Sequence, residues 1–343
     1  GFFDTNVPKS LWIDAKIQGI LQHSPSAELS HPLCPVLLPD KKAPIRWVRG
    51  ISLMTGNLIW IPAVMVFLHF PVRSIGERFW LPISTGCAAH SNIAQALVNA
   101  LCEVIERDAL SITWLARLSL PRLSLEPLPE ALAPYLQRYR HSHITPHFFD
   151  ATTDLGIPTI YAIHLSPHHE RLATVVMCAT DLDPVKAITK VICESASVRI
   201  ALQNPNLVPP SNPDRFITVT DGALYTGAPE RQSAFSFLLE SNHWRSLSEL
   251  SSLDTGDPEQ NLRLLLERLE ACGMEAYAVD LTTDEALRAG MRVVRVIVPG
   301  LQPLSFSYRA RFLGHPRLYA APRSMGYAAI SEADVNPWPQ PFA

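Results

Sequence analysis

The sequence lacks an excess of charge of either sign. Its 343 residues carry 29 lysines and arginines against 32 aspartates and glutamates, a formal net charge of −3. Without surplus basic residues to neutralise a phosphate backbone, nucleic acid is not expected as the main partner. The length and the apolar fraction of 47% are typical of a soluble globular protein of about two domain lengths.

Long apolar runs and closely paired cysteines are also missing. The longest apolar run, 58–72, is broken by Pro62 and His69 and falls short of the roughly 20 residues that a membrane span needs. The six cysteines show no C-x-x-C spacing, and the N-terminal segment does not resemble a secretory signal. We therefore expect a reduced, cytoplasmic protein without a membrane partner.

Glycine is scarce, with 15 residues against 30 prolines, and none of it forms a G-x-x-x-x-G-K-[ST] or G-x-G-x-x-G loop. A P-loop or a Rossmann phosphate cradle is thus excluded. Ser84-Thr85-Gly86, ahead of a predicted helix, could offer backbone donors to an anion or could be a plain turn.

The hydrophobic pattern predicts strands interleaved with helices, a mixed α/β architecture. A helix is expected from Ser91 or Asn92 to about Leu118, and another after Asp183, with Pro184 in its first turn, to about Leu202. The other expected segments are a hairpin at a sheet edge within 45–72, strands at 143–150, 159–165, 171–179, 275–280 and 292–298, and helices at 229–251, 258–272 and, less clearly, 11–22.

The first long helix is apolar around most of its circumference, so it should be largely buried. Its polar residues, spaced by four, four and three, line one narrow face: Gln95, Asn99, Glu103 and Glu106. Two carboxylates on a buried helix repel each other and need a cation. Hard oxygen ligands fit magnesium, which usually binds together with phosphates. The alternatives are that Arg107 or another side chain pairs with the carboxylates, or that the stripe is solvated.

The second helix repeats this design with complementary charge, because Lys186, Lys190, Glu194 and Ser197 share a stripe. Lys190 could hold a phosphate and Glu194 a second ligand position, or the stripe could be an exposed ion pair. Arg199 could bind phosphate or simply favour the helix C-terminus.

Six separated segments follow one another in a distinctive order: STGCAAHSN, ALCEVIERDAL, FFDATTDLGIPT, ITKVICESASVR, RVVRVIVPGLQP and NPWPQPF. Over residues 46–343 this series resembles the YcaO family. The resemblance implies a YcaO-like α/β fold, in which a β-sheet and Glu-bearing buried helices surround a site for ATP and Mg²⁺. It also implies activation of a peptide backbone amide oxygen by phosphorylation.

The resemblance assigns roles by position. Glu103 and Glu106 resemble the magnesium-binding pair, and Arg107 resembles the phosphate-facing arginine that follows it. Lys190 stands where the family often has Arg, and Glu194 matches a family Glu. We count five residues as ATP-binding, namely Arg107, Lys190, Glu194, Gln95 and Arg199. Since Gln95 and Ser197 replace a usual Glu and Gln, one cation is expected to be held less tightly.

The C-terminal Pro337, Pro339 and Pro341 match the Pro-x-Pro-x-Pro of the azoline-forming branch, although the chain ends in Phe342-Ala343. In relatives this motif reaches toward the active site and helps to order it, so we count the three prolines as catalytic. A disordered end is the alternative. The expected organisation is a lead-in at 1–44, an ATP-binding catalytic domain at 45–332 and a Pro-rich tail at 333–343.

The function implied is a cyclodehydratase that forms thiazolines or oxazolines in a ribosomally synthesised peptide. Thioamide or macroamidine formation is the nearest rival. The family's earlier Gly-Lys-Gly stretch and Glu-x-x-Glu-Arg helix would fall before Gly1, which also leaves open a catalytically silent scaffold that presents the precursor peptide. The resemblance implies a separate leader-binding partner similar to a ubiquitin-activating enzyme. The oligomeric state stays open, a homodimer included.

Overall fold

The structure is a computed structural model that describes residues 31–40, 42–139 and 141–342, so the helix predicted at 11–22 lies outside the described residues. The chain divides into two compact units. Unit 1 comprises Gly1–Ile105, Thr255–Pro303 and Phe312–Arg317, and unit 2 comprises Glu106–Asp254, Leu304–Arg311 and Leu318–Ala343. Short 3-10 helices connect longer elements, at Ala63–Met65, Ile75–Glu77, Glu130–Leu132, Pro213–Arg215, Pro229–Phe235, Leu247–Glu249 and Glu332–Asp334.

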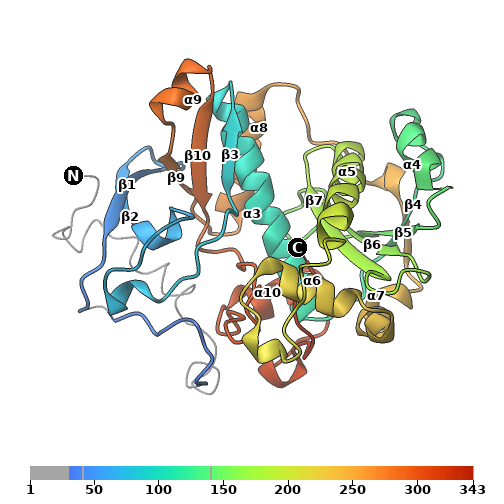
Figure 1. Ribbon diagram of the computed structural model, residues 1–343. Coiled ribbons are helices and arrows are strands. Elements are labelled where there is room, and N and C mark those ends of the chain that lie inside the picture. The colour runs from blue at the N-terminus through green and yellow to red at the C-terminus, as the bar shows by residue number, and fades with distance from the viewer. Residues whose placement is uncertain (1–30, 41, 140, 343) are drawn as a thin grey trace. The chain divides into compact units, whose positions relative to one another are not determined.

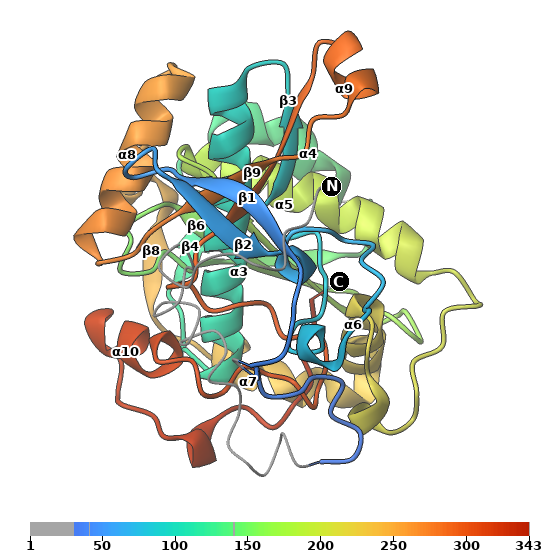
Figure 2. The same cartoon turned by 90° about the vertical axis from the view of Figure 1, so that its left-hand side faces the viewer.

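Unit 1 is built on a five-stranded antiparallel sheet of order β2-β1-β9-β10-β3. Its strands are β1 (Trp47–Ser52), β2 (Leu58–Pro62), β3 (Cys87–His90), β9 (Tyr277–Asp280) and β10 (Arg292–Ile297). The predicted hairpin is confirmed, since β1 pairs with β2, and β2 lies at the sheet edge (Figure 2). Gly56 adopts φ +72° in the turn, a conformation that glycine reaches without steric cost.

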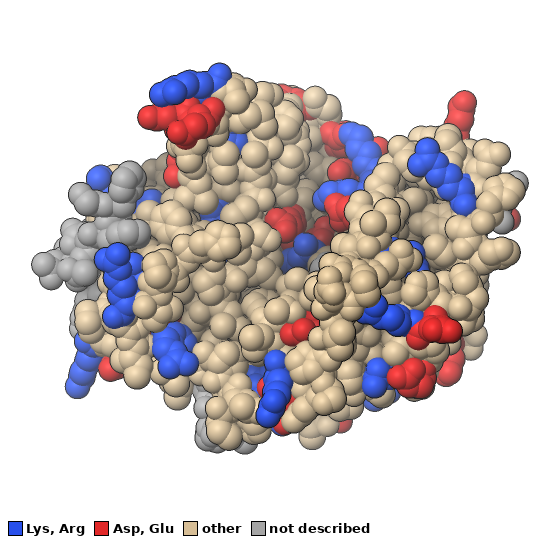
Figure 3. All heavy atoms as spheres, in the orientation of Figure 1, with Lys and Arg blue, Asp and Glu red and all other residues tan. Residues whose placement is uncertain are grey.

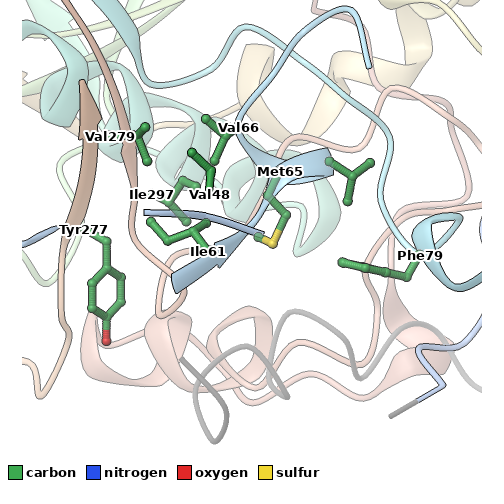
Figure 4. Close-up of a cluster of buried hydrophobic side chains, with 9 residues drawn as sticks. Val48, Ile61, Met65, Val66, Phe79, Tyr277, Val279 and Ile297 are labelled. Carbon is green, nitrogen blue, oxygen red and sulfur yellow. The ribbon is translucent and has the colours of Figure 1, made fainter. Parts of the chain in front are cut away.

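The core of unit 1 gathers apolar side chains from the hairpin and from β9 and β10. Ile61 and Val48 pack against Met65, Tyr277 and Ile297 (Figure 4). The unit also contains α8 (Pro258–Ala271), close to the predicted helix, and the short α9 (Asp284–Arg288).

Unit 2 is built on a second five-stranded sheet of order β7-β6-β5-β4-β8, in which only β4 and β8 pair in parallel. Its strands are β4 (Arg122–Ser124), β5 (Thr145–Asp150), β6 (Thr159–Leu165), β7 (Thr174–Thr180) and β8 (Trp244–Ser246). All seven residues of β7 are buried, and α5 (Pro184–Leu202) packs across β6 and β7 (Figure 1). The predicted start of α5 is confirmed, because the Asp183 side chain accepts the amide of Val185 and Pro184 follows the cap.

The helix predicted at 229–251 is confirmed only in its first half. That segment holds a 3-10 helix (Pro229–Phe235) and the single turn α7 (Ser236–Leu239), but then β8 and a second 3-10 helix (Leu247–Glu249). Long-range pairing decides this region: β8 joins β4 in register, and the Ser241 hydroxyl donates to the Leu120 carbonyl. Unit 2 also contains elements that were not predicted, namely α4 (Ala133–Tyr139), α6 (Val219–Gly227) and most of α10 (Arg317–Ser324).

Helix α3 (Ile93–Leu115) is the long buried helix that the sequence predicts, and it ends slightly earlier than expected. The Asn92 side chain accepts the amide of Gln95, which confirms one of the two predicted caps. Leu101, Leu110 and Ile112 are fully buried. No helix in the described ranges is long and apolar enough to cross a membrane. Acidic and basic side chains intermingle over the face shown in Figure 3, and neither sign covers an extended area there.

Candidate functional site

Glu106 is a buried carboxylate surrounded by donors of unit 2. Only 2% of the residue is exposed. Its carboxylate forms an ion pair with Arg107, accepts the backbone amide of Thr180 at 3.2 Å, and lies 3.9 Å from the Lys190 ammonium. The pairing that the sequence left open is therefore present: two cations neutralise this charge at the end of β7.

Glu103, one helical turn earlier on α3, is half-buried and contacts a turn of unit 1. Its carboxylate accepts the amide of Gly86 at 3.0 Å. Gly86 has φ +83°, and a Cβ there would lie 2.3 Å from the Val296 carbonyl oxygen, so only glycine fits this turn. The Ser84-Thr85-Gly86 turn thus directs a backbone donor at the carboxylate of Glu103.

In the N-terminal part of the polar stripe, two side chains form an exposed hydrogen bond with each other. The Gln95 side-chain amide donates to the Asn99 oxygen at 2.8 Å. Along α3 the stripe therefore runs from an exposed amide pair to the buried carboxylate of Glu106.

The donor set of α3 fits magnesium only together with a phosphate ligand. Among the described residues no group of three or more His, Cys, Asp or Glu side chains could hold a metal ion. Magnesium in phosphate-transfer sites is usually held by one or two carboxylates, with phosphate oxygens and water completing its shell. Glu103 and Glu106, three positions apart on one face of the helix, match that requirement.

The buried thiol of Cys178 on β7 shows which charges gather in unit 2. Burial raises its pKa well above the usual value, and the negative charge of Glu106 adds to this effect. Arg107, Lys190 and Glu194 also act electrostatically on this thiol. The structure thus brings Arg107 and Lys190 to Glu106, and Glu194 acts electrostatically on the same thiol.

Other predicted residues on α5 have contacts elsewhere. Lys186 forms an exposed ion pair with Asp254 at 2.6 Å, and Ser197 is exposed. The Arg199 guanidinium donates to the Ser166 hydroxyl at 2.8 Å and to the Leu172 carbonyl at 3.1 Å, beside the β6–β7 connection. These contacts do not bring Arg199 to Glu106.

The C-terminal tail packs against the end of α3 within unit 2. The backbone amide of Asn336 donates to the Leu115 carbonyl, and the Trp338 carbonyl accepts the indole N–H of Trp114. Pro337 is exposed, whereas the other two prolines of the motif are buried. The alternative of a disordered end does not hold for the described tail residues.

The end of the tail reaches the cations around Glu106. Phe342 forms a parallel bridge with Val176 of β7, and its ring lies under Arg107, with the guanidinium carbon 4.3 Å from the ring centroid. Sequence reasoning missed Phe342, although an aromatic residue after the last motif proline was a visible signal.

The tail also requires a close approach by α6 that the sequence did not reveal. A Cβ on Gly222 would lie 1.9 Å from the backbone oxygen of Gln340. Only the Thr218-x-x-Asp221 capping box signalled that a helix begins here.

Two five-stranded sheets, a helix with a buried carboxylate that pairs with two cations, and a docked Pro-rich tail define an α/β protein. The family model of YcaO cyclodehydratases, which bind ATP and Mg²⁺, matches residues 16–302. The chain belongs to the YcaO family. ATP and Mg²⁺ are thus the cofactors of its family.

Two curated relatives are uncharacterised proteins. One from Methanothermobacter thermautotrophicus is 26% identical over 278 residues, covering 78% of this chain and 68% of the relative. One from Rhizobium leguminosarum bv. trifolii, encoded in the tfuA 3′ region, is 27% identical over 282 residues, covering 77% of this chain and 63% of the relative.

Solved structures share the fold at lower identity. A heterocyclase in complex with substrate and cofactor superposes with a TM-score of 0.81 and 23% identity, covering 97% of this chain and 44% of that protein. YcaO from Methanopyrus kandleri, bound with AMPPCP and Mg²⁺, gives a TM-score of 0.61 and 21% identity, covering 83% of this chain and 73% of that protein. This chain therefore spans less than half the length of the heterocyclase.

Proposed function

We propose that this chain is an ATP- and Mg²⁺-dependent cyclodehydratase that forms thiazolines or oxazolines in a ribosomally synthesised peptide. The observation that carries the proposal is the buried carboxylate of Glu106, held between Arg107 and Lys190 where the tail ends. Membership of the YcaO family supports it.

When bound, ATP supplies the phosphoryl group that activates the amide oxygen, and Mg²⁺ neutralises phosphate charge. The protein contributes positioning and electrostatics, which is most of what phosphoryl transfer requires. Glu103 and Glu106 would hold the metal. Arg107 and Lys190, already held beside Glu106, would turn toward phosphate oxygens, and Glu194 would support the same surface. Gln95 remains a prediction for nucleotide contact. The contacts of Arg199 with Ser166 and Leu172 do not bring it to Glu106, and it is given no role in this reaction.

The tail would hold Arg107 in place. The Phe342 ring lies against the guanidinium, and such cation–π contacts restrict a flexible cation. Pro339 and Pro341 are buried and stiffen the segment that carries Phe342. The three alternating prolines, Pro337, Pro339 and Pro341, favour azoline formation over thioamide or amidine formation.

We also propose a separate partner that binds the leader of the precursor peptide, and a cytoplasmic location. One solved structure with this fold, the E. coli microcin synthetase McbBCD complex, is a multi-protein assembly, and another contains a bound substrate. These observations support a peptide substrate and an assembly for this chain.

Mass spectrometry of the precursor peptide tests the proposal. The full chain with its partner, ATP and Mg²⁺ should remove one water per ring formed. Glu106→Gln should abolish this loss, while Lys186→Gln, a matched change on an exposed ion pair, should preserve it. Ring formation unchanged by Glu106→Gln would refute the assigned site. Replacement of oxygen by sulfur in the product would refute azoline formation in favour of thioamide formation.

A further inference from the structure

Unit 2 contains a cavity of about 300 Å³ that the proposed reaction does not use. It is lined by residues of α4, α5 and β6, three elements that Figure 1 labels. Its walls are largely apolar, with Tyr135, Ile144, Ile192 and Ile200 among them. Concave, mostly apolar sites of this size with a few polar groups are typical of small-molecule sites.

His164 is the first polar group in this cavity. It is 2% exposed, and its Nε2 atom has no hydrogen-bond partner. Burial lowers the pKa of His164 to about 3, helped by the charge of Arg199, so the ring is neutral at pH 7. The Tyr139 hydroxyl lies 3.5 Å from Nδ1, and in the tautomer in which it donates to Nδ1 the ring proton is on Nε2. A buried N–H without an acceptor is unfavourable, and a ligand that accepts its hydrogen bond would relieve this cost.

Arg199 is the second polar group. One nitrogen of its guanidinium is committed to Ser166 and Leu172, but the other, Nη2, is buried without a hydrogen-bond partner. Within the described ranges no carboxylate forms an ion pair with Arg199. A partly buried cation without a counter-ion favours an anionic ligand.

We propose that this cavity binds a carboxylic acid with an apolar body. The carboxylate accepts hydrogen bonds from Arg199 Nη2 and His164 Nε2, and the apolar body contacts the isoleucine side chains. A carboxylate is the anion that a neutral imidazole and a single guanidinium nitrogen can satisfy together with an apolar wall. The acid can be a small molecule or the C-terminal residue of a peptide, because both present the same group.

An exposed thiol reports on the cavity. Cys193 lines it and is exposed, while Cys272 in unit 1 is the second exposed cysteine among the described residues. The rate of maleimide alkylation at both is measured by peptide mass spectrometry on the full chain. N-acetyl-L-phenylalanine at about ten times its Kd should slow alkylation of Cys193 by about tenfold, by mass action, and leave Cys272 unchanged. The uncharged N-acetyl-L-phenylalanine amide should give little protection.

Three variants complete the test. Arg199→Met should remove the protection, whereas Lys186→Met, which removes one charge from the same helix outside the cavity, should keep it. Ala196→Trp, at an exposed position on the cavity wall, should block binding even if Arg199→Met proves unstable.

Two further results decide the question. Protection by a peptide that ends in Phe as well as by the short acid identifies a peptide terminus as the source, and protection by the short acid alone identifies a small molecule. Equal protection by acid and amide, protection that survives Arg199→Met in a folded protein, or no protection at all would overturn the proposal.

Discussion

Gly222→Ala tests whether the docked tail depends on the close approach of α6. The added Cβ would lie 1.9 Å from the Gln340 carbonyl oxygen and 3.1 Å from its carbon. Ordinary van der Waals contact begins at 3.4 Å, so the helix and the tail must separate by about 1.5 Å. Both obstructing atoms belong to the backbone, and no side-chain rotation relieves the overlap.

The magnitude follows from the cost of overpacking, which is about 1–3 kcal/mol. Alanine also improves the helix by about 1 kcal/mol relative to glycine. That gain is the same whether the tail is docked or released, so it does not offset the effect on docking. Gly222→Ala should therefore weaken docking of the tail about 5-fold to 150-fold.

Hydrogen exchange at the tail measures this effect. The amides of Asn336 and Trp338 are hydrogen-bonded in the docked tail, to the Leu115 carbonyl and to the Asn336 side chain. Their exchange should accelerate by the same factor, because exchange follows the open population. Thr220→Ala, on the same helix, is the control. Unchanged exchange at Asn336 in Gly222→Ala would refute the reasoning.

Three further predictions concern stability and the tail. Ile61→Ala should lower the free energy of unfolding of unit 1 by about 2–5 kcal/mol in urea titrations, because Ile61 is fully buried, and the exposed Leu58→Ala should change it by less than about 0.5 kcal/mol. Burial raises the pKa of Glu77, but hydrogen bonds from Arg46 and backbone amides outweigh this and lower it below 4.5. The Glu77 carboxylate therefore stabilises the fold above pH 4.5, and this stabilisation is lost as the pH falls below that value. The urea midpoints of wild type and Glu77→Gln should differ at pH 7 and converge in acid. A difference that stays constant with pH would contradict this. Phe342→Ala should weaken Mg²⁺-dependent ATP binding in calorimetry about 2-fold to 30-fold, and unchanged affinity would show that the tail does not hold Arg107.

Local signals predicted the elements that local chemistry decides. The Asp183-Pro184 start of α5 and the apolar circumference of α3 appear in the structure as the sequence indicates. The polar stripe of α3 also indicated a buried carboxylate that needs a cation, and the pairing of Glu106 with Arg107 was one of the alternatives that the sequence left open.

Long-range pairing explains what the sequence did not reveal. β8 exists because Arg122–Ser124 offers it a parallel partner far away in the chain, so the local pattern misled in the second half of 229–251. The contact of Phe342 with Arg107 joins residues from the chain end and from α3, and no periodicity encodes it. The sequence pattern did not predict α6, because glycine disfavours a helix. Gly222 is nevertheless required there, since the tail backbone passes too close for a Cβ atom.

A thermal-shift titration with ATP, with and without Mg²⁺, tests the central claim that the carboxylates of α3 hold a metal-bound nucleotide. At a hundredfold excess over Kd, a ligand of the native state adds about 2.7 kcal/mol of stability. The account predicts a Mg²⁺-dependent rise in Tm for the wild type that is lost in the Glu103→Ala, Glu106→Ala double variant. The same rise in both proteins would contradict the assigned site, and no rise in the wild type would contradict nucleotide binding by this chain.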